Sequence, residues 1–207
     1  MISHKHQCIF IHIPRTAGTS VEHWIQGCDQ WFINPREKHL TGLEAKKLYA
    51  EYWTKYFKFS IVRSPISRFI SMLKFPEHFG VETGANGLLE IKSYIARFGP
   101  EPTLEHDHRY SSRESLLSLS SELCYHFQNG SLYGNMLGNE VDRIFLYVEI
   151  EGMVHELAKR LGLDATEFPC LEKSQAPNIH KPIIGKEVES SIQSMHNADY
   201  KLYGLAD

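Results

Sequence analysis

Hydrophobic residues are nearly continuous close to the N-terminus and then change to a helical spacing. The run Ile9–Ile13 is largely apolar and β-branched and stops at Pro14. Three apolar residues then recur at the spacing of a buried helix face: Val21, Trp24 and Ile25. The pattern predicts a strand, a tight loop and a helix. Gly18 gives the loop backbone freedom, and Thr19 or Ser20 can cap the helix start.

The predicted loop has the features of an anion site. Several backbone N–H groups converge at the positive end of the helix, where phosphate is the most frequent ligand. Arg15 adds a planar guanidinium that matches phosphate or sulfate oxygens. The loop differs from that of nucleoside triphosphatases, because aligning Gly18 with the last glycine of that motif puts Ile13 at its first glycine and Thr19 at its lysine. An ordinary strand-to-helix turn with a surface arginine is the alternative.

The same pattern occurs a second time further along the chain. Phe57–Val62 is an apolar run with alternating polar positions, and it leads into Arg63 and Pro65. Apolar residues then recur at helical spacing: Ile66, Phe69, Ile70 and Leu73. Pro65 suits the first turn of a helix. We therefore expect a second strand, turn and helix, with Arg63 at the strand end and Ser71 two turns into the helix.

Three further segments complete the predicted fold. Val141–Val148 indicates another buried strand, and the helix after it ends at Gly162. Thr41 and Glu44 have the spacing of a capping box at a helix start, and Trp31–Ile33 favours a short strand or edge segment. Alternating strands and helices predict an α/β fold with a mainly parallel sheet covered by helices on both faces.

Composition narrows the class of protein. A chain of 207 residues without a marked linker has the size of one α/β domain, so we expect a single domain over residues 1–207. A net charge of −3 argues against a general nucleic-acid binder. Four cysteines without a Cys-x-x-Cys pair suit reduced thiols. An apolar run long enough to cross a bilayer is absent from the sequence.

Both motifs resemble those of sulfotransferases that use 3′-phosphoadenosine 5′-phosphosulfate (PAPS). Residues 14–20, Pro-Arg-Thr-Ala-Gly-Thr-Ser, resemble the family's 5′-phosphosulfate loop, although Arg15 stands where lysine is commoner. Arg63 and Ser71 have the spacing of the pair that holds the 3′-phosphate in the family. The resemblance implies a P-loop-like sulfotransferase fold, PAPS as cosubstrate and no metal. The donor-binding residues that it implies are Arg15, Thr16, Ala17, Gly18, Thr19, Ser20, Arg63 and Ser71.

The same resemblance suggests the catalytic residues. His39 lies between the two motifs, just before the helix predicted to start at Thr41. In the branch of the family that sulfates carbohydrates, including heparan-type glycans, a histidine in this segment is the catalytic base. We therefore infer His39 as the base and Arg15 as the group that stabilises the leaving 5′-phosphate. His12, at the end of the first strand, is expected to support Pro14 and Arg15 through a hydrogen bond.

Residues 74–110 have poor periodicity and many Gly and Pro residues, which predicts a long connection with a binding role. His106 and His108 are the alternative bases there. The segment Glu105–His108 also invites a metal site, but the third and fourth ligands are not identified, and we favour a solvated polar loop. In the family a glutamine near the position of Gln128 often lies close to the acceptor, which makes Gln128 a candidate for binding the acceptor, together with His106 and His108.

The predicted function is therefore sulfuryl transfer from PAPS to a hydroxyl or amine, with a carbohydrate as the favoured acceptor. A small-molecule kinase and a binding module for a phosphorylated ligand are the alternatives. The loop lacks the Gly-Lys of the nucleoside triphosphatase motif, which counts against a kinase. The presence of His39 as a candidate base counts against a binding module without chemistry. Many animal members of the family carry an N-terminal membrane anchor, whereas the residue pattern of this N-terminus predicts neither an anchor nor a signal peptide. We expect a soluble, cytoplasmic protein of bacterial type.

Overall fold

The computed structural model describes residues 1–73, 132–169, 171, 189–190, 193–194 and 196–205. They belong to two compact units. The first comprises Met1–Arg63 and Tyr133–Lys173, and the second comprises Ser64–Leu132 and Ser174–Asp207. The single domain expected over residues 1–207 stays a prediction.

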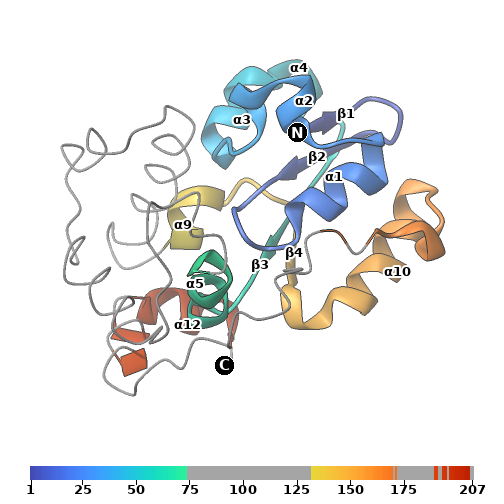
Figure 1. Ribbon diagram of the computed structural model, residues 1–207. Coiled ribbons are helices and arrows are strands. Elements are labelled where there is room, and N and C mark those ends of the chain that lie inside the picture. The colour runs from blue at the N-terminus through green and yellow to red at the C-terminus, as the bar shows by residue number, and fades with distance from the viewer. Residues whose placement is uncertain (74–131, 170, 172–188, 191–192, 195, 206–207) are drawn as a thin grey trace. The chain divides into compact units, whose positions relative to one another are not determined.

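A mostly parallel sheet of four strands runs through the described part of the first unit (Figure 1). The strands, in their order across the sheet, are β1 (Ile2–Ser3), β2 (Cys8–Ile11), β3 (Phe57–Val62) and β4 (Arg143–Leu146). β1 pairs with β2 in the antiparallel sense, whereas β2, β3 and β4 are parallel. All of β2 is buried, as expected of a strand covered on both faces. The predicted mixed α/β fold with a mostly parallel sheet is confirmed.

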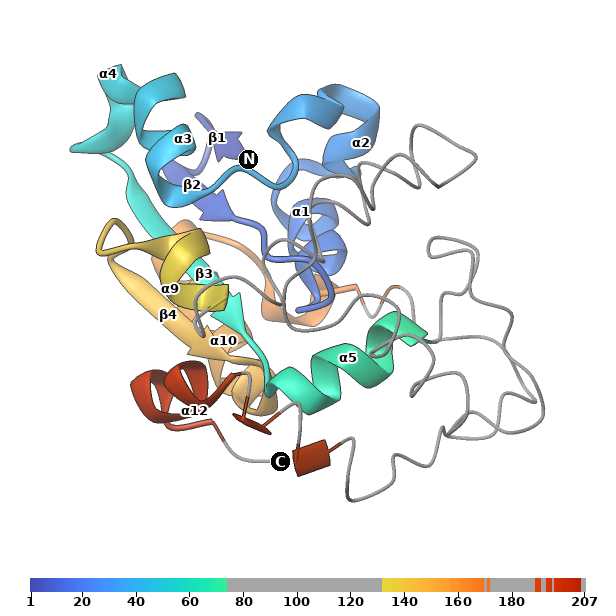
Figure 2. The same ribbon diagram turned by 90° about the vertical axis from the view of Figure 1, so that its left-hand side faces the viewer.

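α1 (Gly18–Gln26) and α10 (Ile150–Leu161) cover one face of the sheet (Figures 1 and 2). Their buried side chains join those of three strands in one apolar cluster, which includes Cys8, Phe10, Val21, Trp24, Ile25, Phe59, Ile61, Phe145, Met153, Val154, Leu157 and Leu161. α10 ends at Gly162, whose φ of 68° is in the left-handed region. The helix end predicted from this glycine is confirmed.

α3 (Gly42–Leu48) and α9 (Leu132–Leu137) lie on the opposite face (Figure 2). The capping box predicted for α3 is present: the Thr41 N–H donates to Glu44 Oε2 at 2.8 Å, and the Glu44 N–H donates to Thr41 Oγ1 at 3.3 Å. A Cβ at Gly42 would lie 2.5 Å from the carbonyl oxygen of Leu137. The absence of a side chain at Gly42 thus allows α3 and α9 to approach closely.

Two predicted elements differ from the structure. The strand predicted as buried over Val141–Val148 is limited to β4, of which only Phe145 is buried, and Val148 is exposed. Residues Trp31–Ile33 belong to a short helix, α2 (Gln30–Ile33), and not to a strand. Asp29 caps this helix by accepting the Trp31 N–H at 2.7 Å. Local capping therefore prevails over the strand preference of the three apolar residues, all of which are exposed. The remaining short elements of this unit are η1 (Pro35–Glu37), α4 (Ala50–Trp53), η3 (Tyr147–Glu149) and η4 (Ala165–Glu167).

The described helices of the second unit are α5 (Pro65–Leu73) and α12 (Asn197–Tyr203). α5 begins at Pro65, as the sequence predicts. Ser64 stabilises its first turn, since its carbonyl accepts the Arg68 N–H at 2.8 Å and its hydroxyl accepts the Ser67 N–H at 3.2 Å. In the part of the chain that the structure describes, the helices are too short or too polar to cross a membrane.

Candidate active site

The connection from β2 to α1 has an unusual backbone. Arg15 and Ala17 both have left-handed φ values, of 67° and 69°, on either side of Thr16. Such values are uncommon for residues with a side chain, and they occur where successive N–H groups turn toward one point. α1 begins directly afterwards at Gly18. The backbone of residues 15–17, followed directly by the first turn of α1, is therefore compatible with the predicted anion loop.

The helix cap differs from the sequence prediction. The N-cap residue of α1 is Ala17, and no side chain makes a capping hydrogen bond. Ser20, one of the two expected caps, is buried, and its hydroxyl accepts the Leu171 N–H at 3.2 Å. Thr16 is also buried, and its hydroxyl donates to the Ile13 carbonyl at 2.8 Å. These hydroxyls fix the loop, and the loop's shape depends on the backbone of Arg15 and Ala17.

Gly18 is needed for a different reason from the one expected. Its φ is not in the left-handed region, so the loop conformation does not require a glycine at this position. A Cβ at this position would lie 2.0 Å from both Cδ2 and Nε2 of the His12 imidazole. No side chain fits at that distance. Gly18 therefore allows the His12 ring to pack against the first residue of α1.

His12 follows the last residue of β2, and its contacts correct the expectation that its ring supports Pro14 and Arg15. Its Nδ1 lies 2.6 Å from Glu22 Oε1, on the buried side of α1. Its backbone carbonyl accepts a hydrogen bond from His39 Nδ1 at 3.1 Å. Burial lowers the pKa of His12, although Glu22 acts in the opposite direction. His12 thus connects the loop to both α1 and His39.

His39 is placed on the connection before α3, as expected, and is held beside the loop. A carbonyl oxygen only accepts, so Nδ1 of His39 carries the proton and Nε2 of the neutral ring has a free lone pair. The imidazole also makes edge contacts with the rings of His12 and Trp31, at centroid distances of 4.6 and 6.0 Å. Burial, together with the positive potential of His12 and Lys38, lowers the pKa of His39 well below its usual value. The ring is therefore neutral near pH 7 and able to accept a proton at Nε2.

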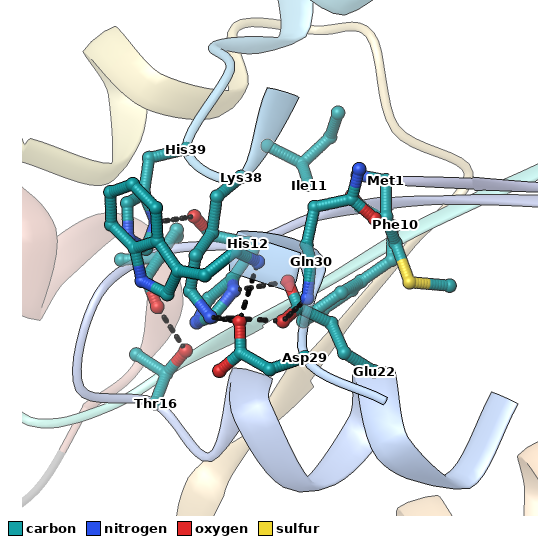
Figure 3. A network of polar contacts seen from close by, with 12 residues as sticks. Met1, Phe10, Ile11, His12, Thr16, Glu22, Asp29, Gln30, Lys38 and His39 are labelled. Atoms are coloured by element: carbon teal, nitrogen blue, oxygen red, sulfur yellow. Dashed lines mark hydrogen bonds and ion pairs between the residues drawn. The ribbon is translucent and has the colours of Figure 1, made fainter. Parts of the chain in front are cut away.

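Beside this histidine lies a set of charges that sequence reasoning missed. Glu22 of α1, Asp29, Lys38 and His12 are in direct contact, and we call them the buried ionic cluster (Figure 3). Lys38 Nζ donates to Glu22 Oε2 at 3.1 Å and also to Asp29 Oδ1. The backbone N–H of Gln30 donates to Glu22 Oε2 at 3.1 Å. The sequence did contain one signal for this cluster. Glu22 is a charged residue between Val21 and Trp24, two residues of the helix face that the apolar spacing predicts to be buried.

Arg63 reaches the same loop from the carboxyl end of β3. Its Nη1 donates to the carbonyl oxygen of Arg15 at 3.3 Å, and its guanidinium lies over the ring of Tyr147 at 4.2 Å. Its backbone N–H donates to the Tyr133 hydroxyl at 3.2 Å, and that hydroxyl donates to the Arg63 carbonyl. Stacking on an aromatic ring and bonding to backbone oxygen orient the arginine. The structure thus brings Arg63 of the second motif to the loop of the first.

The remaining predicted site residues lie either in the second unit or outside the described residues. Ser71 lies on α5 in the second unit and is partly exposed. The acceptor candidates His106, His108 and Gln128 lie outside the described residues. Among the residues that the structure does describe, no group of three or more His, Cys, Asp or Glu side chains is arranged to hold a metal ion.

Residues 1–77 match the model of the sulfotransferase family, a stretch that includes the loop, His39 and Arg63. The resemblance inferred from the two motifs is confirmed at the level of this family, whereas the carbohydrate-sulfating branch stays a prediction. No curated protein and no solved structure matches the chain.

Proposed function

Because the first 77 residues match the sulfotransferase family, we propose that this protein transfers a sulfuryl group from PAPS to a hydroxyl or amine acceptor. The observation that carries the proposal is the meeting of three groups on one loop. They are the left-handed backbone at Arg15 and Ala17, the Arg63 guanidinium at the Arg15 carbonyl, and the His39 imidazole at the His12 carbonyl. Anion binding and proton acceptance are the two tasks that sulfuryl transfer requires of a protein.

The loop has the right donors for the phosphosulfate end of PAPS. Backbone N–H groups of residues 16–20 and the Arg15 guanidinium would bind its oxygens, with Thr16 and Ser20 fixing the loop through the hydrogen bonds described above. Negative charge grows on the leaving 5′-phosphate as the sulfuryl group departs, so donors fixed in advance lower the barrier. Arg63 and Ser71 would hold the 3′-phosphate.

The acceptor side depends on His39. Nε2 is the free acceptor of this neutral ring, so it would take the proton that the acceptor hydroxyl or amine loses as its oxygen or nitrogen bonds to sulfur. The bond from sulfur to the 5′-phosphate oxygen breaks in the same step. The exposed ring of Trp31 beside His39 offers an apolar surface, and a carbohydrate remains our favoured acceptor.

A transfer assay tests the proposal. The protein is incubated with ³⁵S-labelled PAPS and a panel of glycans, phenols and amines, without added metal, and the products are examined for labelled sulfate. Parallel reactions with γ-³²P-labelled ATP and magnesium test the small-molecule kinase. We expect labelled sulfate on at least one acceptor class and no transfer of phosphate. Binding of PAPS without transfer to any acceptor would favour a binding module, and transfer of phosphate alone would favour a kinase.

A further inference from the structure

Lys38 is an unusual residue to find next to a candidate base. The sequence places it in a polar loop, yet only 3% of its surface is exposed. Burial of an isolated ammonium group is very unfavourable, so its charge must be matched. The match comes from two carboxylates on different parts of the chain, Glu22 on α1 and Asp29 before α2. Figure 3 shows Lys38 pointing toward both.

These contacts tie three segments to one another. Glu22 accepts from Lys38 and from the backbone N–H of Gln30, so α1 is joined both to the residue before His39 and to α2. Asp29 accepts from Lys38 and from the Trp31 N–H. The backbone at residue 38 is therefore fixed relative to α1. His39 is the next residue, so the position of its ring depends on the same contacts.

Stability alone does not explain this arrangement. Buried ionic groups are often replaceable by apolar residues of similar volume with no loss of stability, or with a gain. An ionic cluster fixes the orientation of the groups around it, because each hydrogen bond holds an atom of one segment against an atom of another. Here the relevant orientation is that of the His39 ring. Its Nδ1 donates to the His12 carbonyl at 3.1 Å, and this hydrogen bond leaves Nε2 as the proton acceptor.

We propose that Lys38 is a positioning residue for His39, which it holds on the His12 carbonyl through its bonds to Glu22 and Asp29. The inference rests on the proposed role of His39 as the base. Lys38 itself does not touch the reacting groups. Its loss leaves the donor loop intact and frees the ring of His39 to adopt other orientations and the other tautomer.

The test combines a spectroscopic signature with a rate. Long-range ¹H–¹⁵N spectra of histidine-labelled protein identify which nitrogen of His39 carries the proton, and a single-turnover reaction with labelled PAPS gives the transfer rate. The first variant is Lys38→Met, which keeps an unbranched stem. Since this change leaves two buried carboxylates without their cation, a second variant combines it with Glu22→Gln and Asp29→Asn. That combination buries no unpaired charge, and both amides keep an oxygen for the Gln30 and Trp31 N–H groups.

Lys46→Met is the matched control. Lys46 makes an ion pair of 3.0 Å with Glu140 in the same unit, but half of its side chain is exposed and it has no contact with the cluster. We expect wild type and control to show the proton on Nδ1 of His39. In the folded triple variant we expect a mixture of tautomers and transfer slower by about tenfold to a hundredfold, with PAPS affinity unchanged.

Two results separate the possible failures. A folded triple variant with its proton still on Nδ1 and the wild-type transfer rate would overturn the positioning role of Lys38. If the wild-type protein transfers no sulfate to any acceptor, the proposed function fails, and the tautomer comparison still decides whether Lys38 positions His39.

Discussion

The loop after β2 is held at two places in chemically opposite ways. At the first place, the backbone carbonyl of His12 accepts a hydrogen bond from the neutral imidazole of His39. The buried ionic cluster, which includes the His12 side chain, lies beside this contact. At Arg15, its carbonyl meets the guanidinium of Arg63, which also lies on the face of Tyr147. The partners at the first place include charged groups, with Lys38 paired to the carboxylates of Glu22 and Asp29. The backbone carbonyl and the aromatic ring that contact the Arg63 guanidinium at the second place are uncharged groups.

The difference assigns a separate task to each place. We infer that the buried ionic cluster fixes the position of His39, whose lowered pKa leaves the ring neutral near pH 7 and able to accept a proton. An arginine oriented by a carbonyl and an aromatic ring suits recognition of a phosphate. Damage at the first place should therefore affect transfer, and damage at the second should affect donor binding.

The largest expected effect follows from His39→Ala. Loss of a general base typically slows the chemical step by about a hundredfold to ten-thousandfold. Because His39 is not a donor-binding group in this account, the affinity for PAPS stays near the wild-type value in titration calorimetry. His155→Ala, an exposed histidine on α10, serves as the control. Single-turnover transfer at the wild-type rate would move the base elsewhere, with His106 and His108 as the next candidates.

The buried ionic cluster should make stability depend on pH. Burial alone would raise the pKa of Glu22, but the contacts with His12, Lys38 and the Gln30 N–H outweigh it and lower the pKa from 4.5 to about 2. As the pH falls, the unfolded chain takes up this proton first. The stabilisation is thus complete above about pH 5 and is lost as the pH falls toward about 2.

Glu22→Gln isolates this contribution. Urea unfolding at pH 7 should show the variant to be less stable than wild type, and the gap should narrow steadily below about pH 5. Glu156→Gln is the control, since Glu156 pairs with Arg143 on the surface of the same unit. A gap that is equally large at pH 7 and pH 3 would show that Glu22 contributes through packing and not through its charge.

A smaller effect is expected from Gly18→Ala. The new Cβ would collide with the His12 ring at 2.0 Å, and overpacking of this kind costs about 1–3 kcal/mol. Gly152→Ala is the matched control, because that glycine lies within α10 and a Cβ there has no neighbour within 4 Å. The control should be as stable as wild type or more stable by up to about 1 kcal/mol. Equal thermal unfolding of both variants would mean that His12 can move away at no cost.

What the sequence predicted correctly was local. The strand and helix at either side of the loop, the capping box at Thr41 and the helix end at Gly162 each depend on residues within a few positions of one another. Periodicity and capping chemistry are visible at that range. The placement of His39 before a helix was predicted for the same reason.

What the sequence did not predict depends on distant contacts. Lys38 looks like a surface residue until Glu22 and Asp29 are seen to surround it, and Arg63 owes its orientation to Tyr133 and Tyr147, far along the chain. The spacing of hydrophobic residues does not predict contacts between residues that are far apart in the sequence. The short helix at Trp31–Ile33 was missed because a cap at Asp29 prevails over the strand preference of the apolar residues.

Nucleotide binding tests the central claim most directly. Titration calorimetry should compare 3′-phosphoadenosine 5′-phosphate with ADP, using wild type, Arg63→Ala and, as a control, Arg143→Ala on the neighbouring strand. A charge-assisted hydrogen bond contributes about 1.5–3 kcal/mol, so wild type and control should prefer the 3′-phosphorylated nucleotide by about tenfold to a hundredfold. Arg63→Ala should lose that preference. Equal affinity of the wild-type protein for the two nucleotides would contradict the assignment of this loop and Arg63 to a PAPS site.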